Sequence, residues 1–223
     1  MTSLERLGTP PNLIEEPALR SFGKYAPRGT FARQSEWERL AVAQHNGLPT
    51  RCLDWTGSPL IATHFATVER SHYTADGAVW CVDSTLVRDH FLPKEMGAAL
   101  CDAHAWIYDV RMLDREFPQL SDFDATDRSS GDVLLFLEPP SIDARIENQF
   151  GILSLMNGPS KSHDAYLRQC SREERNLVRR IIIDRRAKPE IRDMLDQNNI
   201  TERMLFPGLP GLCDWLRRYY GPA

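Results

Sequence analysis

The sequence has 223 residues, of which 42% are hydrophobic and 26% charged, and its formal net charge is −4. No apolar run approaches the roughly 20 residues of a membrane-spanning helix, so we expect no membrane association. The negative charge argues against a protein that works mainly by coating nucleic acid. Five scattered cysteines favour reduced thiols, and the first residues carry no secretory pattern, which together predict a cytoplasmic protein.

The first part of the chain predicts three helices and a strand. Apolar residues recur at helical spacing over 12–25, 36–45 and 58–69, and the run GAVWCVD at 77–83 is typical of a strand. The expected helix caps are Asn12 for the first helix, Ser35 for the second, in a capping box with Glu38, and Asp54 or Thr56 for the third.

The rest of the chain predicts a mixture of short strands and helices. We expect helical insertions and loop over 88–131. Further strands are expected over 132–137, 150–156 and 177–183, and helices over 187–196, 201–206 and 212–219. Strands and helices do not alternate regularly, so the pattern predicts an α+β fold of several short strands with flanking helices. We expect a single domain over residues 1–223, with its core at about 3–220.

The segment from Trp37 to Ala66 stands out for its polar residues. A connector between two helices could be built from simpler residues, whereas a ligand pocket needs groups that orient and an aromatic wall that stacks. The alternative is structural: Asp54 and Thr56 cap the next helix, Arg51 pairs with Asp54, and His45 satisfies a backbone carbonyl. The polar and aromatic residues of this loop are Gln44, His45, Asn46, Thr50, Arg51, Asp54, Trp55 and Thr56.

This segment resembles a known family. The run AQHNGLPTRCLDWTGSPLIATHFA is similar to the central motif of FRG domains. The resemblance continues in GAVWCVD, in ARIENQFGILSL and in ITERMLFPGLPGLCDWLRRYY, so it extends from about Ser3 to Tyr220. The Phe-Arg-Gly tripeptide that names the family normally precedes an S-L-x-R stretch, which here is Ser3 to Arg6. This sequence therefore lacks the strand that carries the tripeptide.

FRG domains in turn resemble ADP-ribosyltransferases, which implies an α+β fold of that type and NAD as cosubstrate. The resemblance implies that Leu53 to Thr56 and the following helix shape the nicotinamide site, and that Gln149 lies near the ribose. Cleavage of the glycosidic bond of NAD passes through an oxocarbenium-like state, which a carboxylate stabilises. Gln149 lacks charge, so the catalytic carboxylate would be Glu147, on the same face of an extended segment.

The expected site therefore has two parts, and each has an alternative interpretation. For Arg145, Glu147 and Gln149 the alternative is an exposed edge that forms salt bridges. The arginine of the Phe-Arg-Gly tripeptide is absent, so we expect weak NAD binding. Arg6 is the nearby residue that could partly replace that arginine. The expected catalytic residues are Gln149, Glu147 and Asp54, and the expected NAD-binding residues are Arg6, His45, Thr50, Arg51, Trp55, Thr56 and Arg145.

The resemblance implies a nucleotide-using transferase of bacterial or phage origin, acting as a toxin or defence effector on a protein or nucleic acid acceptor. The rival interpretation is a noncatalytic module that binds a ligand, a protein or nucleic acid. Arginines cluster over 168–192 among acidic residues, which favours a solvated edge, with a phosphate-contacting edge as the alternative. Cys101 and His104 have the spacing of two metal ligands but no second close pair, so we expect no metal site.

Overall fold

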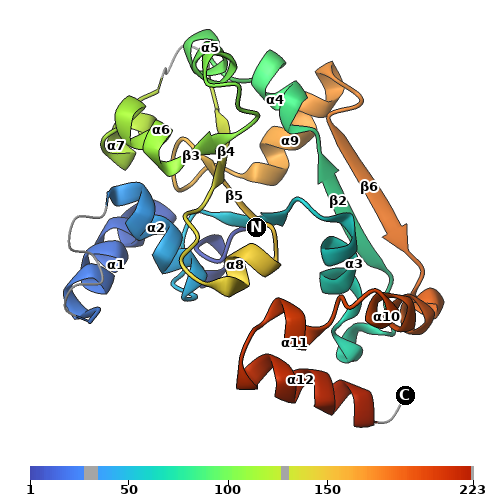
Figure 1. The fold of residues 1–223 in the computed structure, drawn as a ribbon. Helices are drawn as coiled ribbons and strands as arrows, with labels where there is room; N and C mark the ends of the chain where they lie inside the picture. Colours follow the sequence, from blue (N-terminus) through green and yellow to red (C-terminus); the bar gives the residue numbers. More distant parts are fainter. Residues whose placement is uncertain (28–34, 127–130, 222–223) are drawn as a thin grey trace. The chain divides into compact units, whose positions relative to one another are not determined.

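The computed structural model describes residues 1–27, 35–126 and 131–221 (Figure 1). The chain divides into two compact units, and each unit is built from three separate stretches of sequence. Unit 1 comprises Met1–Asp54, Asp83–Pro140 and Ile152–Leu177, and unit 2 comprises Trp55–Val82, Ser141–Gly151 and Val178–Ala223. Short strands and flanking helices confirm the predicted α+β class, while the expectation of one domain over residues 1–223 remains a prediction.

Unit 1 begins with the short 3-10 helix η1 (Glu5–Leu7), followed by α1 (Pro11–Tyr25) and α2 (Glu36–His45). The predicted cap at Asn12 is wrong, because α1 starts one residue earlier, at a proline whose fixed φ suits the first turn. The predicted cap at Ser35 is confirmed: its hydroxyl accepts a hydrogen bond from the backbone N of Glu38 at 3.1 Å.

The larger sheet contains β1 (Leu53–Thr56), β5 (Gly151–Met156), β4 (Leu134–Glu138) and β3 (Tyr108–Asp109), in that spatial order. β4 pairs antiparallel with β5 and parallel with β3. Four of the five residues of β4 are buried, which explains its continuous apolar sequence LLFL. The strands expected at 132–137 and 150–156 are therefore confirmed, and the boundaries between the two units fall within β1 and β5.

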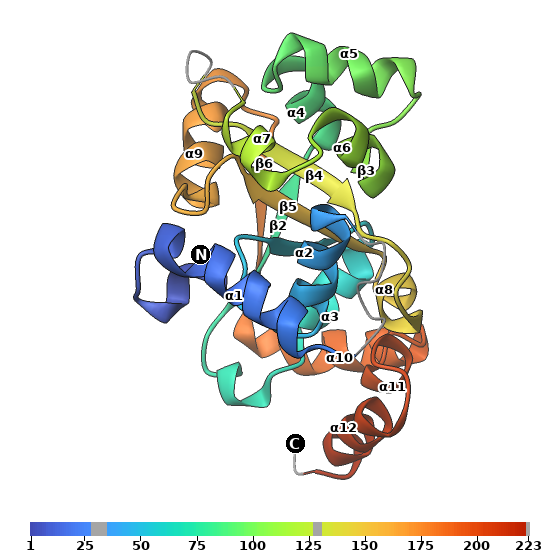
Figure 2. The same ribbon diagram turned by 90° about the vertical axis from the view of Figure 1, so that its left-hand side faces the viewer.

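The region 88–131 is mainly helical in its described part, as expected. It contains α6 and α7, whose residues pack around Trp37 of α2. The indole Nε1 of Trp37 donates to the carbonyl of Phe117 at 2.7 Å. The ring of Phe123 packs edge to face against the rings of Trp37 and Phe117. α2 contacts α1 and α6, and Figure 2 shows α1 beside α2. The remaining helices of unit 1 are α4 (Ser84–His90), α5 (Lys94–Asp102), α6 (Val110–Glu116), α7 (Leu120–Asp124) and α9 (His163–Glu173).

Unit 2 has a two-stranded antiparallel ribbon of β2 (Gly77–Val82) and β6 (Val178–Ile183), and α3 (Pro59–Thr67) packs against β2. The cap of α3 is Ser58, whose hydroxyl accepts from the backbone N of Ile61, so the expectation of Asp54 or Thr56 is wrong. Both of those residues belong to β1 instead. The other helices of unit 2 are α8 (Ala144–Asn148), α10 (Lys188–Gln197), α11 (Glu202–Leu205) and α12 (Leu209–Tyr220).

Charged side chains are buried among the helices of unit 2. Arg192 of α10 lies with its Nη1 2.8 Å from Nδ1 of His64 in α3. Arg218 of α12 forms ion pairs with Asp196 and Glu202, and Arg192 also pairs with Asp196. This cluster connects four helices, α3, α10, α11 and α12, through side chains that are far apart in sequence.

Candidate functional site

Two hydrogen bonds join the turn after β1 to the corner between α8 and β5. The hydroxyl of Thr56 donates to the backbone carbonyl of Gln149 at 2.7 Å, across 93 positions of sequence. The backbone N of Gly57 donates to the carbonyl of Phe150 at 3.0 Å. All four residues belong to unit 2. The two blocks of the FRG resemblance that contain Thr56 and Gln149 therefore meet at their backbones.

Phe150 forms the corner itself. Its φ is 48°, in the left-handed region that bulky residues rarely adopt, and its backbone N donates to the carbonyl of Glu147 at 3.1 Å. The side chain is 65% exposed, so burial of the ring does not compensate for the strained backbone. Strain of this kind at an exposed aromatic residue is typical of functional sites.

Residues 144–148 form the helix α8, so the expectation that Glu147 and Gln149 share a face of an extended segment is wrong. The physical cause is the cap at Asp143, whose Oδ1 accepts from the backbone N atoms of Arg145 at 2.9 Å and Ile146 at 3.3 Å. Glu147 is exposed on this helix, whereas Gln149 is half-buried at its end.

Side chains of α8 and of Gln149, the residue after it, contact the end of α11 and Phe206. The amide of Asn148 donates to the carbonyl of Met204 at 2.7 Å, and the amide of Gln149 donates to the carbonyl of Leu205 at 2.9 Å. The guanidinium of Arg145 stacks on the ring of Phe206, 4.9 Å from its centroid. These contacts replace the salt bridges of the alternative interpretation, and they give Arg145 and Gln149 a positioning role.

Arg51 is committed to a buried ion-pair network in unit 1. Its Nε lies 2.8 Å from a carboxylate oxygen of Glu15 in α1, and its Nη atoms bond both oxygens of Asp124 in α7. Burial opposes the charged form, but the hydrogen bonds with the two carboxylates outweigh it and raise the pKa of Arg51 above its usual value. The expectation that Arg51 pairs with Asp54 is therefore wrong. Arg51 instead stabilises the fold through its ion pairs with Glu15 and Asp124.

A second network holds the loop that contains Thr50. Gln44 accepts from the hydroxyl of Thr50 at 2.6 Å and donates to the carboxylate of Asp54 at 2.8 Å. Thr50 also accepts from the backbone N of Cys52 at 3.1 Å, and its side chain is fully buried. Thr50 thus stabilises the loop through buried hydrogen bonds, while Asp54 is exposed in strand β1.

The other expected site residues are less constrained. His45 is the last residue of α2 and is half-buried, as is Trp55 in β1. Arg6 is exposed in η1 and donates to the carbonyl of Met1 at 3.3 Å. Arg6, His45, Thr50, Arg51 and Asp54 belong to unit 1, whereas Trp55, Thr56, Arg145, Glu147 and Gln149 belong to unit 2.

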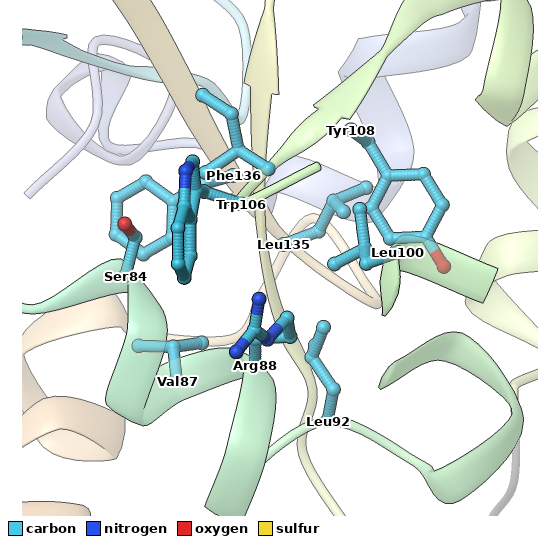
Figure 3. Close-up of a pocket in the computed structure, with 10 residues that line it drawn as sticks. Ser84, Val87, Arg88, Leu92, Leu100, Trp106, Tyr108, Leu135 and Phe136 are labelled. Atoms are coloured by element: carbon cyan, nitrogen blue, oxygen red, sulfur yellow. The ribbon is translucent and has the colours of Figure 1, made fainter. Parts of the chain in front are cut away.

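A separate pocket in unit 1, shown in Figure 3, has an empty volume of about 190 Å³ that includes open solvent. The guanidinium of Arg88 lies over the ring of Trp106, 4.7 Å from its centroid, and its Nε already pairs with Asp89 at 2.6 Å. Sequence analysis did not single out these residues, because none belongs to a recognisable motif. Apart from Arg88, the pocket is lined by Ser84, Val87, Leu92, Leu100, Trp106, Ile107, Tyr108, Leu135 and Phe136.

The protein has an α+β fold. Strand β1, the turn after it and helix α3 form a strand-turn-helix element, and hydrogen bonds join this element to the strained corner at Phe150. The family model described as FRG domain matches residues 1–75, which confirms the expected resemblance over that part of the chain. No curated protein and no solved structure matches the chain.

Two features are absent from residues 1–27, 35–126 and 131–221. No helix there is both long enough and apolar enough to cross a membrane. Within the same ranges, no group of three or more His, Cys, Asp or Glu residues is arranged to hold a metal ion.

Proposed function

We propose that the corner formed by Thr56, Glu147 and Phe150 binds the nicotinamide ribose of NAD, and that the protein is an ADP-ribosyltransferase-like enzyme. The observation that carries this proposal is the pair of hydrogen bonds from Thr56 and Gly57 to Gln149 and Phe150. They hold a strand-turn-helix element against the end of α8, which is the arrangement that the resemblance to ADP-ribosyltransferases implies.

Glu147 and Phe150 supply the two kinds of group that NAD cleavage needs. The carboxylate of Glu147 is exposed, and its backbone carbonyl accepts from the backbone N of Phe150, so the two residues are neighbours. A carboxylate stabilises the positive charge that develops on the ribose, and an exposed aromatic ring offers a surface on which nicotinamide stacks. The strained backbone of Phe150 is then part of the site.

The reaction that we propose breaks the glycosidic bond between nicotinamide and the ribose. Nicotinamide leaves as a neutral molecule, and a nucleophilic oxygen or nitrogen of the acceptor forms the new bond to the same ribose carbon and loses its proton. Glu147 stabilises the oxocarbenium-like state between these events. Gln149 acts through its contact with Leu205 and keeps the corner in place.

A noncatalytic binding module is the second candidate, and one observation favours it. Thr50, Arg51 and Gln149 all use their side chains in contacts within the chain. The motif would then be a scaffold that presents Phe150 to a ligand, without turnover.

Release of nicotinamide from NAD, followed by chromatography, tests the first candidate, and calorimetric titration of NAD measures binding separately. Glu147→Gln is expected to abolish release while binding persists, because the amide keeps the shape and loses the charge. Glu190→Gln in α10, also an exposed acid of unit 2, is the matched control and should leave both unchanged. NAD binding without release would support the binding module, and absence of both would contradict a nucleotide site at this corner.

A further inference from the structure

The outer strand of the unit 2 ribbon is uncovered on both faces. Four consecutive residues of β6, from Arg179 to Ile182, are exposed, although side chains alternate between the two faces of a strand. Ile181 is 56% and Ile182 is 52% exposed. An exposed strand with large aliphatic side chains is unusual, because its unpaired edge is a template for another strand.

β2 is the inner strand of the same ribbon. Val79 is buried, and a Cβ at Gly77 would lie 2.8 Å from the carbonyl of Ala66 in α3, so this strand packs closely on that helix. Figure 1 shows β2 and β6 side by side, with α3 next to β2. Over the ranges that the structure describes, β6 pairs with β2 alone. The edge of β6 that faces away from β2 is therefore unpaired within these ranges.

The exposed face of the ribbon combines apolar and basic groups. Trp80 of β2 and Arg180 of β6 are directly opposite in register, and the guanidinium lies 5.5 Å from the centroid of the indole ring. Ala78 and Ile182 are the next opposite pair on this face. Arg179 lies on the other face of β6, so each face presents one arginine. Neither arginine forms an ion pair with any residue that the structure describes.

We propose that β6 docks an extended segment of a protein partner in which two adjacent acidic residues lie next to two adjacent β-branched residues, and that this segment adds a third strand to the ribbon. Backbone hydrogen bonds along the free edge supply affinity, and the side chains of the added strand select for sequence. The acidic residues pair with Arg179 and Arg180, and the β-branched residues pack on Ile181 and Ile182.

The charges of Arg179 and Arg180 favour an acidic peptide strand over two other candidate occupants of this edge, a second copy of β6 and a single-stranded nucleic acid. Antiparallel pairing of β6 with a second copy would bring four arginines into one sheet without an acidic partner, whereas opposite charges on paired strands are stabilising. A single-stranded nucleic acid would use the arginines and Trp80 but would leave both isoleucines in water. An acidic strand satisfies the cations and covers the aliphatic side chains together. The inference is independent of the proposed function.

The test uses the full chain and two fluorescein-labelled peptides as long as β6, in which pairs of adjacent charged residues alternate with pairs of adjacent valines. The charged residue is glutamate in one peptide and lysine in the other. Fluorescence anisotropy is expected to show saturable binding of the glutamate peptide only. The double variant Arg179→Glu with Arg180→Glu should weaken that binding at least about ten-fold and should acquire binding of the lysine peptide. Because a misfolded variant cannot gain a partner, this exchange of preference also reports on folding.

Arg217→Glu in α12 is the matched control, since Arg217 is an exposed arginine of unit 2 away from the ribbon, and it should bind as the parent does. A glutamate peptide with N-methyl groups along one edge should fail to bind, because it cannot complete the strand ladder. Equal binding of the two peptides, tighter binding of oligothymidylate than of the glutamate peptide, or self-association that Arg179→Glu relieves would each overturn the proposal.

Discussion

Gln149 donates its side-chain amide to the backbone carbonyl of Leu205 at 2.9 Å, and this bond links two blocks of the FRG resemblance. The glutamine lies at the end of α8, and the leucine is the last residue of α11 and the first of the LFP run. The two blocks are therefore parts of one structural arrangement in unit 2. Their side chains hold the corner at Phe150 from one side, while Thr56 holds it from the other.

Gln149→Leu is expected to destabilise the protein by about 1 kcal/mol, because the carbonyl of Leu205 loses a partly buried donor. The free energy of unfolding from urea titration measures this effect. Gln149→Glu should cost more, because a carboxylate in place of the amide faces a carbonyl oxygen. If both variants unfold like the parent but fail to bind NAD, then Gln149 contacts the ligand directly and its positioning role is wrong.

Arg51→Ala is expected to cost about 3–5 kcal/mol, because it leaves the buried carboxylate of Glu15 without its partner. Chemical denaturation at neutral pH measures the loss. Glu15→Gln tests the same network from the other side and should cost less, since the amide still hydrogen-bonds to Arg51. A change below about 1 kcal/mol for Arg51→Ala would contradict the bracing role that the ion pairs indicate.

His64 predicts a loss of stability in acid. Burial and the nearby charge of Arg192 lower the pKa of His64 to about 4, although Glu202 and the backbone of Ile200 act in the opposite direction. The usual pKa of histidine is near 6.5, so the unfolded chain binds the proton first as pH falls. His64 therefore does not reduce the free energy of unfolding above pH 6.5. As pH falls from 6.5 to 4, the free energy of unfolding decreases by about 3 kcal/mol.

Thermal unfolding across that pH range provides the measurement. His64→Gln should flatten the dependence, because glutamine does not titrate. His90→Gln, at the exposed end of α4, is the control and should leave the slope unchanged. If the slope of the His64→Gln variant equals that of the parent, other groups cause the acid sensitivity.

Phe150→Gly is expected to stabilise the fold by about 1 kcal/mol, because glycine adopts a φ of 48° without strain and little ring burial is lost. The same variant should weaken NAD binding, since the aromatic surface is removed. Phe150→Ala removes the ring and retains the strain, so it should lose binding without the gain in melting temperature. Equal melting temperatures for the two variants would show that the backbone at this corner is unstrained.

Asp54→Ala is expected to cost up to about 1 kcal/mol, because Gln44 loses the acceptor that fixes its amide above Thr50. Asp54→Asn keeps an acceptor oxygen and should retain most of the stability, and differential scanning calorimetry compares the two. A larger loss for the asparagine variant would show that the charge of Asp54, and not its hydrogen bond to Gln44, stabilises the loop.

Regular periodicity made most of the elements predictable. β2, β4, β5 and β6 were expected from short apolar runs, and α10 and α12 from helical spacing, since these patterns reflect which faces are buried. β1 and α8 were missed because their runs LDWT and ARIEN mix polar and apolar residues without a clear period. Their conformations depend on Asp143 and on contacts with distant segments, which a local pattern does not contain.

The candidate site was predictable in its composition but not in its contacts. The sequence drew attention to Arg51 and Thr56, yet their partners lie far away: Glu15 is 36 positions from Arg51, and Gln149 is 93 positions from Thr56. A carboxylate in an amphipathic helix such as Glu15 normally faces solvent, so nothing local marks it as a buried partner. Spacing within the motif therefore suggested Asp54 as the partner of Arg51, which the structure corrects.

The chain alternates between its two units in six stretches, and so passes from one to the other five times. The stretch matched by the FRG family model, residues 1–75, ends inside unit 2 and lacks β4, β5 and β6. It carries β1 without the neighbouring strand, and Arg51 without Asp124. Residues 1–75 expressed alone are therefore expected to lack part of the structure that holds the motif in the full chain.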